Sequence, residues 1–441
     1  MVDIFDIEKK YKKDLESLEE WNYLRNIYRS IDTQNKNTYK INKIDAIKSI
    51  FYGFKNWFRS YDYLVFSYSS ERRLIKNKFF DIRVDSLIDI INNNNTLLIE
   101  NPDILHKKKK LMHTKVLVSR RLIDIFTIIL VKLTKKNYSY NILDIFNKKD
   151  DLNLDYSSYI NRFNAQYKIH KLWFKLIKPK VIYLDCFYDK QYIIKAAKEL
   201  DIEIIDVQHG LIGKNHSAYF SRLNLSSFYL PDKLFSFGIS EKKNTMYNGL
   251  IKKENIFPIG SFYLDYKKRN RIEDKSLIRI LSNYNKIVGV TLQWTVEDKL
   301  IDFIINIARI ELDTIFILIP RTYTNKYTKI QLPKNVILYP TLDFYTLITY
   351  CTFHTTVNST CALEAPILGI DNILIDIDNL ATLFLKELVS EKNTTIALTE
   401  KDFIKALNTN TNKNEITSDN NFIKFSTENL RNILNYSDPT N

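Results

Sequence analysis

Two glycines follow an apolar run in Ile202-Glu203-Ile204-Ile205-Asp206-Val207-Gln208-His209-Gly210-Leu211-Ile212-Gly213. The run predicts a buried strand over 203–207, and residues 181–185 predict another. Between them, 191–200 has helical spacing, so strand, helix and strand succeed one another within residues 181–207. This succession is typical of a βαβ unit, whose two strands are parallel and whose crossover is right-handed.

The same alternation extends in both directions. Upstream, residues 1–55 have helical periodicity, short strands are expected at 63–67 and 96–100, and helical spacing covers 105–133 and 156–177. Downstream, a strand is expected at 233–238 and a helix at 241–250. A second series then predicts strands at 287–293, 314–319, 336–338, 353–357 and 373–375, and helices at 296–310, 343–350 and 361–368.

These elements predict two doubly wound, Rossmann-type α/β domains that face each other across a cleft, with a helical N-terminal region. The expected boundaries are an acceptor-side domain over 1–266, a charged linker over 267–286, a nucleotide-sugar-binding domain over 287–407, and a tail with a last helix over 408–441. In such folds ligands bind at the carboxyl ends of the parallel strands. The candidate site residues are therefore those that follow strands.

The chain is basic, with 65 Lys and Arg against 51 Asp and Glu, a net charge of +14. This excess favours anionic partners such as nucleotides, lipid head groups or acidic glycans, although an AT-rich coding sequence also enriches Lys, Asn, Ile and Tyr. Lys107–Lys110 with Arg120 and Arg121 is a candidate patch for an anionic membrane, a solvated helix face being the commoner explanation. We find no Walker A motif or nucleic-acid module, and expect no nucleic-acid partner.

Three scattered cysteines, Cys186, Cys351 and Cys361, favour a reducing compartment over a disulfide framework or a zinc site. The N-terminus lacks the pattern of a signal peptide. The apolar run 122–133 is too short to cross a bilayer. We therefore expect a cytoplasmic protein, attached at most to the inner face of the cell membrane, that needs neither a metal nor a bound cofactor.

The first candidate site follows the strand at 203–207. We expect His209 to project into the cleft as an acid–base group, with Gly210 leaving room for the donor through a positive φ or a close approach. The alternative is a histidine that only orders a turn. Asp185 ends the neighbouring strand and is a second candidate, either as a base or as an ordinary helix cap. His216 is a weaker candidate, for the acceptor.

The second candidate site begins the helix at 361–368. Ser359 and Thr360 precede that helix, whose free N–H groups suit a phosphate, and Glu364 lies one turn further on, within reach of ribose hydroxyls. An ordinary N-cap explains the same residues. Gln293 and Arg321 end two strands of the second domain, where a guanidinium suits a diphosphate. Arg72, after the strand at 63–67, is placed at the acceptor by position alone.

The chain resembles the bacterial cell-surface polysaccharide glycosyltransferases of GT-B fold, of the capsule and lipopolysaccharide type. The resemblance covers about residues 180–380 and rests on the order of four segments: Gln208-His209-Gly210, Pro231–Gly238, Ile259–Asp265 and Asn358–Ala365. It implies a reaction centre at His209 and donor-phosphate binding at Ser359, Thr360 and Glu364. Relatives that use cytidine nucleotides have His-Pro where this chain has Pro320-Arg321, which argues against such a donor.

The expected activity is metal-independent transfer of a sugar from a nucleotide-activated donor to a surface polysaccharide or a lipid-linked glycan. The residues do not decide between inversion and retention, because Asp185 suits either a base or a nucleophile. Two alternatives stay open. One is transfer of a polyol phosphate, as in enzymes of the CDP-glycerol type, and the other is a non-catalytic partner that binds a glycan or a nucleotide.

Overall fold

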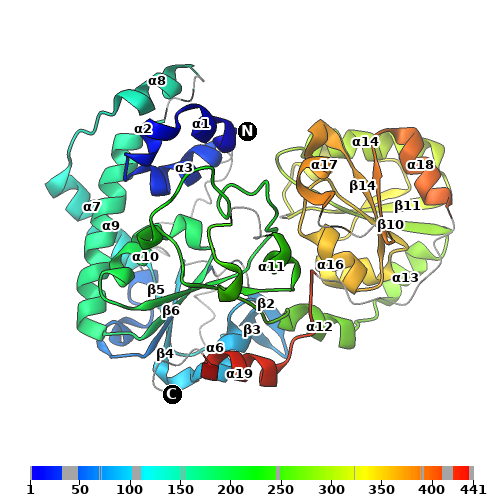
Figure 1. The fold of residues 1–441 in the computed structure, drawn as a ribbon. Helices are drawn as coiled ribbons and strands as arrows, with labels where there is room; N and C mark the ends of the chain where they lie inside the picture. Colours follow the sequence, from blue (N-terminus) through cyan, green and yellow to red (C-terminus); the bar gives the residue numbers. More distant parts are fainter. Residues whose placement is uncertain are drawn as a thin grey trace.

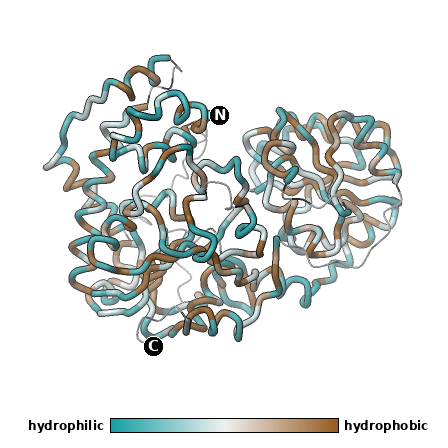
Figure 2. Tube along the Cα trace, viewed as in Figure 1, coloured by the Kyte–Doolittle hydropathy of each residue, from teal (hydrophilic) through white to brown (hydrophobic). Residues whose placement is uncertain are grey.

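The computed structural model describes residues 2–31, 48–68, 70, 72–101, 111–149, 152, 154–244, 249–321, 323–387, 389, 392–409 and 421–436. Its described part forms two α/β domains side by side (Figure 1). Hydrophobic residues concentrate in the interior of each (Figure 2). Among the described helices, none is long and apolar enough to cross a membrane.

The N-terminal domain is built on a parallel sheet with the strand order β5-β4-β1-β6-β7-β8-β9. Its strands are almost wholly buried on both faces, as is typical of parallel sheets that helices cover. Their bounds are β1 Tyr63–Tyr68, β4 Thr96–Asn101, β5 Leu117–Ser119, β6 Val181–Asp185, β7 Glu203–Val207, β8 Lys233–Ser236 and β9 Ile256–Pro258. A separate antiparallel hairpin joins β2 (Arg72–Ile75) to β3 (Lys78–Asp81).

The C-terminal domain is built on a second parallel sheet, with the order β12-β11-β10-β13-β14-β15. The register pairs β10 with both β11 and β13, so the order reverses beside the first strand of the domain, as in doubly wound sheets. The bounds are β10 Lys286–Thr291, β11 Thr314–Ile319, β12 Val336–Leu338, β13 Phe353–Thr355, β14 Asp371–Ile375 and β15 Thr394–Ala397.

Helices cover both faces of the two sheets (Figure 1). In the N-terminal domain they are α1 Ile4–Lys10, α2 Lys12–Glu16, α3 Trp21–Arg29, α6 Asp85–Ile91, α7 Arg121–Thr134, α8 Asn141–Lys149, α9 Tyr156–Ile177, α10 Gln191–Lys198, α11 Ser240–Asn244 and α12 Phe262–Arg269. In the C-terminal domain they are α13 Lys275–Leu281, α14 Glu297–Ile310, α15 Phe344–Leu347, α16 Cys361–Ile367, α17 Leu380–Leu385 and α18 Glu400–Asn408. The short 3₁₀ helices are η1 Phe54–Phe58, η3 Asn93–Asn95, η5 Phe187–Asp189, η6 Ser227–Tyr229, η7 Lys253–Asn255, η8 Tyr327–Lys329, η9 Ile348–Tyr350 and η10 Ile377–Asn379.

The chain ends on the domain in which it begins. The last helix, α19 (Thr427–Tyr436), lies beside α6 (Figure 1). Its Leu430 is fully buried in one cluster with Val84 and Leu87. The segment that leads to it is tied to the same domain, because Ile423 N–H donates to the Phe237 carbonyl at 2.9 Å. The C-terminal segment therefore completes the N-terminal domain.

The predicted fold class is confirmed, with two parallel sheets in the expected succession. The helix expected over 156–177 is α9, with both ends at the predicted residues. It begins after the N-cap Asp155, which accepts from Ser158 N–H at 3.0 Å, and it ends before Lys178, whose φ is 51°. Two expectations need correction. Strand β5 interrupts the helix expected over 105–133, and half of the expected linker over 267–286 is helical. Leu277 and Leu281 of α13 are buried against the second sheet, which is why that segment is ordered.

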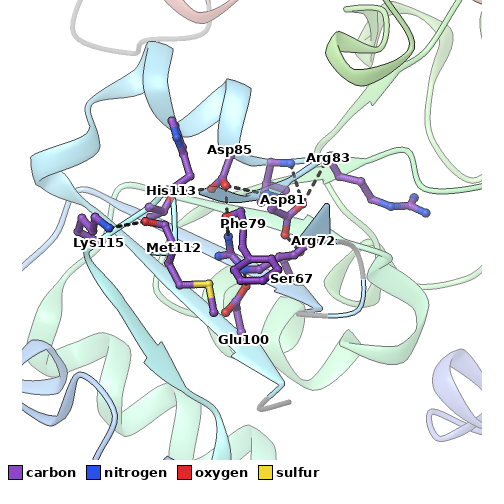
Figure 3. A network of polar contacts seen from close by, with 12 residues as sticks. Ser67, Arg72, Phe79, Asp81, Arg83, Asp85, Glu100, Met112, His113 and Lys115 are labelled. Carbon is purple, nitrogen blue, oxygen red and sulfur yellow. Dashed lines mark hydrogen bonds and ion pairs between the residues drawn. The ribbon is translucent and has the colours of Figure 1, made fainter. Parts of the chain in front are cut away.

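A buried network of charges holds the hairpin β2–β3 against the first sheet (Figure 3). The Arg72 guanidinium lies in it, bonded to Glu100 at 2.7 Å, to Asp85 at 3.3 Å and to the Phe79 carbonyl at 2.8 Å. All three charged side chains are fully buried. Arg72 was expected to bind an acceptor, and this expectation is wrong, because its cation is enclosed by carboxylates of its own domain.

The network also fixes the turn before α6. The Asp81 carboxylate accepts from the N–H groups of Arg83 and Val84 at 3.0 and 3.2 Å, while Asp85 accepts from the N–H of Asp81 at 2.7 Å. Burial raises the pKa of Asp85 to about 7 against the opposing effect of Arg72. The Arg83 side chain points away from the network (Figure 3). The buried charges therefore hold in place the turn from which the Arg83 side chain extends.

Replacing Arg72 by Met is expected to destabilise the protein by about 3–5 kcal/mol, because it leaves buried carboxylates without their cation. Equilibrium unfolding in urea measures the change. Arg73→Met is the matched control, since the partly exposed Arg73 bonds only to carbonyls of its own turn in the described structure, Ser70 at 2.8 Å and Arg72 at 2.9 Å. A loss below about 1 kcal/mol for Arg72→Met would contradict a structural role for this cation.

A buried histidine on α9 makes stability depend on pH. His170 packs among aromatic rings, bonds through Nδ1 to the Gln166 carbonyl at 2.7 Å, and has no Nε2 partner among the described residues. Burial lowers the pKa of His170 to about 3. Because the unfolded chain binds this proton near pH 6.5, acid favours unfolding. From pH 7 to pH 5, we expect His170→Phe to lose about 2 kcal/mol less stability than the wild type, measured by urea unfolding. Equal losses of stability in the variant and the wild type would contradict this role of His170.

Candidate functional site

The candidate site lies where β6 and β7 end. The Tyr188 hydroxyl, in η5, meets His209 Nε2 at 2.8 Å. The Tyr188 ring also contacts the ring of His216, with 5.7 Å between centroids, and the Arg29 guanidinium stacks on it at 4.7 Å. Loops after two neighbouring strands and the end of α3 therefore meet around one tyrosine. Tyr188 and Arg29 were not among the predicted site residues.

Buried polar side chains at the end of β7 hold these loops. Asp206 accepts from the N–H of Phe187 at 3.0 Å and from the hydroxyl of Tyr219 at 2.8 Å. The Gln208 amide donates to the Gly210 carbonyl at 3.0 Å and to Glu241 at 2.9 Å, while its oxygen accepts from Phe237 N–H at 2.7 Å. Each loop bond has a buried partner, so the position of His209 is set by the sheet beneath it.

The environment keeps His209 neutral. Burial lowers the pKa of its imidazole well below the ordinary value, and the charges of Arg83, His216, Lys190 and Arg29 lower it further. Its Nδ1 is buried and has no hydrogen-bond partner among the described residues. When Nε2 carries the proton and donates to the Tyr188 oxygen, Nδ1 is a free acceptor. The arrangement is that of a proton acceptor with its lone pair uncommitted.

Asp185 is buried at the end of β6 and forms an ion pair with Arg83, Nη1 to Oδ1, at 3.7 Å. Lys190 lies beneath, where its ammonium donates to the Asp185 carbonyl at 2.6 Å, to the Tyr68 hydroxyl at 2.7 Å and to Asp189 at 2.8 Å. Asp185 is therefore the anion that faces the Arg83 cation. Its predicted chemical role stays a prediction.

The predicted residues of the second domain gather at the start of α16. Ser359 accepts from Cys361 N–H at 3.3 Å, and the Thr360 side chain makes no capping bond. Glu364 accepts from the Tyr345 hydroxyl at 3.0 Å. Gln293 ties the ends of two strands together, since its oxygen accepts from Asn358 N–H at 2.7 Å.

Arg321 stands apart from these bonds. Its side chain is exposed and stacks on Trp294 at 5.6 Å, and it forms no ion pair with another described residue. A guanidinium in this state keeps its five donors for solvent or a ligand.

The two halves of the site meet through the loop after β7. Leu211 packs against two clusters of the second domain, which contain Leu363 and Ala362 of α16. Asn215 donates to the Leu383 carbonyl at 2.6 Å, and Lys214 forms an ion pair with Glu387. The segment that carries His209 is therefore docked directly on the helix that carries Glu364.

Arg83 is a third residue of the site that sequence reasoning missed, besides Tyr188 and Arg29. Its charge acts on His209 and also on Tyr345, whose pKa is raised by burial and by Glu364 while Arg73 and Arg83 oppose the rise. Its charge therefore acts both on the β7 loop and on Tyr345 of the second domain. The chain offered one signal, the spacing Asp81-x-Arg83-x-Asp85, in which two carboxylates flank the arginine.

One alternative expected for Gly210 is wrong: among the described glycines, positive φ occurs at Gly53, Gly260 and Gly369, not at Gly210. A Cβ at Gly210 would meet only open space, and the close approach of a donor there stays a prediction. The expected basic membrane patch falls largely outside the described residues, because Lys107–Lys110 are not among them. Of its two described members, Arg120 is largely buried and paired with Asp124 at 3.3 Å.

No family model and no curated protein matches the chain. Solved structures do match it. S. aureus MnaA, solved with UDP, has a TM-score of 0.56 at 11% identity and covers 85% of this chain and 96% of its own. The UDP-GlcNAc 2-epimerase of Methanocaldococcus jannaschii, in complex with UDP-GlcNAc and UDP, has a TM-score of 0.53 at 14% identity, with 85% and 99% covered. That of Neisseria meningitidis, bound to UDP-GlcNAc, has a TM-score of 0.50 at 12% identity, with 86% and 99% covered.

These neighbours overturn the expected activity. They are UDP-GlcNAc 2-epimerases, which act on a nucleotide sugar and do not transfer it to a glycan, so the expectation of a glycosyltransferase that elongates a surface polysaccharide is wrong. Polyol-phosphate transfer and a non-catalytic role fit these neighbours no better. At such low identities the likeness establishes architecture: the chain has the GT-B-like fold of two Rossmann-type domains that these epimerases share.

Proposed function

We propose that this protein is an enzyme that binds a uridine-diphosphate N-acetylhexosamine between its two domains and inverts the sugar at C2. The likeness to structures solved with UDP or UDP-GlcNAc over 85% of the chain supports the substrate class. The observation that carries the proposal is the His209 loop, in which a neutral imidazole with a free Nδ1 lies beside the Arg83 cation and docks on α16.

In this proposal, cations and hydroxyls of both domains hold the diphosphate. Arg83 and Arg321 supply guanidinium groups, which pair with phosphate oxygens bidentately. Ser359 and Thr360 add hydroxyl donors at the start of α16, and Glu364 accepts from ribose. No metal or cofactor is assigned to the site, since the guanidinium groups themselves offset the charge of the leaving diphosphate.

Inversion at C2 sets chemical demands that this site meets. The C2 hydrogen of the bound sugar is not acidic, because no carbonyl adjoins that carbon. Departure of the diphosphate from C1 leaves a cation at C1, and loss of the C2 proton then forms a C1–C2 double bond. Return of a proton to the opposite face of C2 and of the diphosphate to C1 gives the epimer, with all atoms balanced. The enzyme must stabilise the departing anion, supply a base on one face of C2 and let a proton from solvent reach the opposite face.

His209 is assigned as that base. Its lowered pKa leaves the imidazole unprotonated at neutral pH, and in the tautomer in which Nε2–H donates to the Tyr188 oxygen the lone pair of Nδ1 is left for the substrate proton. Arg83 has a second effect here, because a cation beside the imidazole keeps it neutral until it takes the substrate proton.

The proposal predicts epimerisation of UDP-GlcNAc with solvent exchange at C2. In D₂O, proton NMR is expected to show the 2-epimer and loss of the C2 proton signal, because the proton taken by the base is replaced from solvent. UDP-glucose serves as the comparison substrate. Binding of UDP-GlcNAc in calorimetry without epimer or exchange would reject the C2 chemistry, and absence of binding would reject the substrate class as well.

His209→Ala is expected to lower kcat by about 100-fold or more with little change in Tm, because it removes an acid–base group from a half-buried loop position outside the hydrophobic core. The control is His113→Ala, a histidine paired with Asp89 at 2.9 Å outside the site. Because the pKa of His209 lies below its ordinary value, kcat/KM is expected to stay level as pH falls through 6.5 and to decline only in stronger acid. A decline centred at or above pH 6.5, or normal turnover of the variant, would remove His209 from the chemistry.

A further inference from the structure

Helix α7 carries an apolar surface on the outside of the N-terminal domain. Of its 14 residues only Ile123 and Thr127 are buried. Large apolar side chains are exposed instead: Phe126 by 51%, Ile128 by 57%, Ile129 by 49% and Leu133 by 77%. A helix that is apolar nearly all round is ordinarily buried. The hydrophobic colour of α7 can be followed in Figure 2.

The neighbouring helix α9 extends this surface. Lys136, beyond the end of α7, bonds to Asn161 near the start of α9 at 2.8 and 2.7 Å. Arg120, at the start of α7, affects the pKa of His170 near the other end of α9. The two helices are therefore antiparallel, side by side as in Figure 1. Leu172 and Leu176 of α9 are exposed by 64% and 70%.

Basic side chains predominate around this apolar surface, although Glu199 of the neighbouring segment pairs with Lys171 of α9 and Asp62 pairs with Lys180. Residues 121–136 and 156–180 contain a single acidic residue, Asp124, and its carboxylate is paired with Arg120 at 3.3 Å. The basic side chains that are exposed here are Lys132, Lys135, Lys136, Arg162, Lys168, Lys175, Lys178 and Lys180. Exposed aliphatic and aromatic side chains with basic neighbours are the composition of helices that lie in the interface of an anionic bilayer.

We propose that the surface formed by α7 and the exposed side of α9 docks on an anionic membrane. Phe126, Ile129 and Leu133 enter the boundary between head groups and acyl chains, and the lysines of α9 meet the lipid phosphates. Self-association through the same surface is disfavoured, because it would bring two arrays of basic side chains together around one apolar contact. The proposal is independent of the reaction catalysed.

Cosedimentation with vesicles tests the proposal. The full-length protein is expected to bind vesicles of equal parts phosphatidylglycerol and phosphatidylcholine, and to bind pure phosphatidylcholine at least about tenfold more weakly. The variant F126S/I129S/L133S is expected to lose binding by about tenfold or more. The matched control I310S/L312S/L398S removes side chains exposed by 60%, 73% and 69% in the C-terminal domain and is expected to bind like the wild type.

A second variant keeps the test valid if the apolar triple variant does not fold. K168Q/K175Q changes two exposed residues of α9, and several-fold weaker binding to the anionic vesicles is expected, with an unchanged circular dichroism spectrum. Equal binding to both vesicle types overturns the proposal. Absence of vesicle binding overturns it as well. If the protein is then a dimer in light scattering and F126S/I129S/L133S is a monomer, the surface binds a second copy of the chain.

Discussion

The burial of one cation constrains the whole N-terminal half of the site. Arg72 is enclosed by Glu100 and Asp85, and no water can replace either partner in a site that is fully buried. Such a charge must be compensated by its ion pairs, and those of Arg72 fix the hairpin β2–β3, the end of β4 and the first turn of α6 relative to one another. The turn that results is the one from which Arg83 reaches the loops after β6 and β7.

Arg83 then links the two domains electrostatically. It pairs with Asp185, lowers the pKa of His209 and acts on Tyr345 across the domain boundary. The geometry of such a site depends on the relative position of the two domains, and the contacts of Leu211 and Asn215 with the second domain hold that position. The same architecture serves different reactions, since function resides in side chains placed on a fold. This is why motif order indicated a sugar transferase while the structural neighbours are nucleotide-sugar epimerases.

The two faces of the N-terminal domain meet opposite physical demands. On the side of the site, polar side chains such as Gln208 and Asp206 are buried and fully bonded, so the loops are held in one arrangement. On the side of α7, apolar side chains remain in contact with solvent. An exposed apolar surface raises the free energy of the protein alone and is offset only when another phase covers it. We infer that the free-energy cost of exposing the apolar side chains of α7 is offset where this surface meets a membrane.

The sequence by itself determined the local elements and their succession. Apolar runs and caps place β6, α9 and β7, and polar residues after strands located His209, Asp185 and the start of α16, because these signals act over a few neighbouring residues. Only the tertiary structure decided that Arg72 is enclosed while Arg83 faces the site, that β5 interrupts a helical pattern, and that α7 is exposed. Each of these features depends on contacts between residues far apart in the chain. The periodicity of a sequence shows which face of an element is apolar, but it does not show what covers that face.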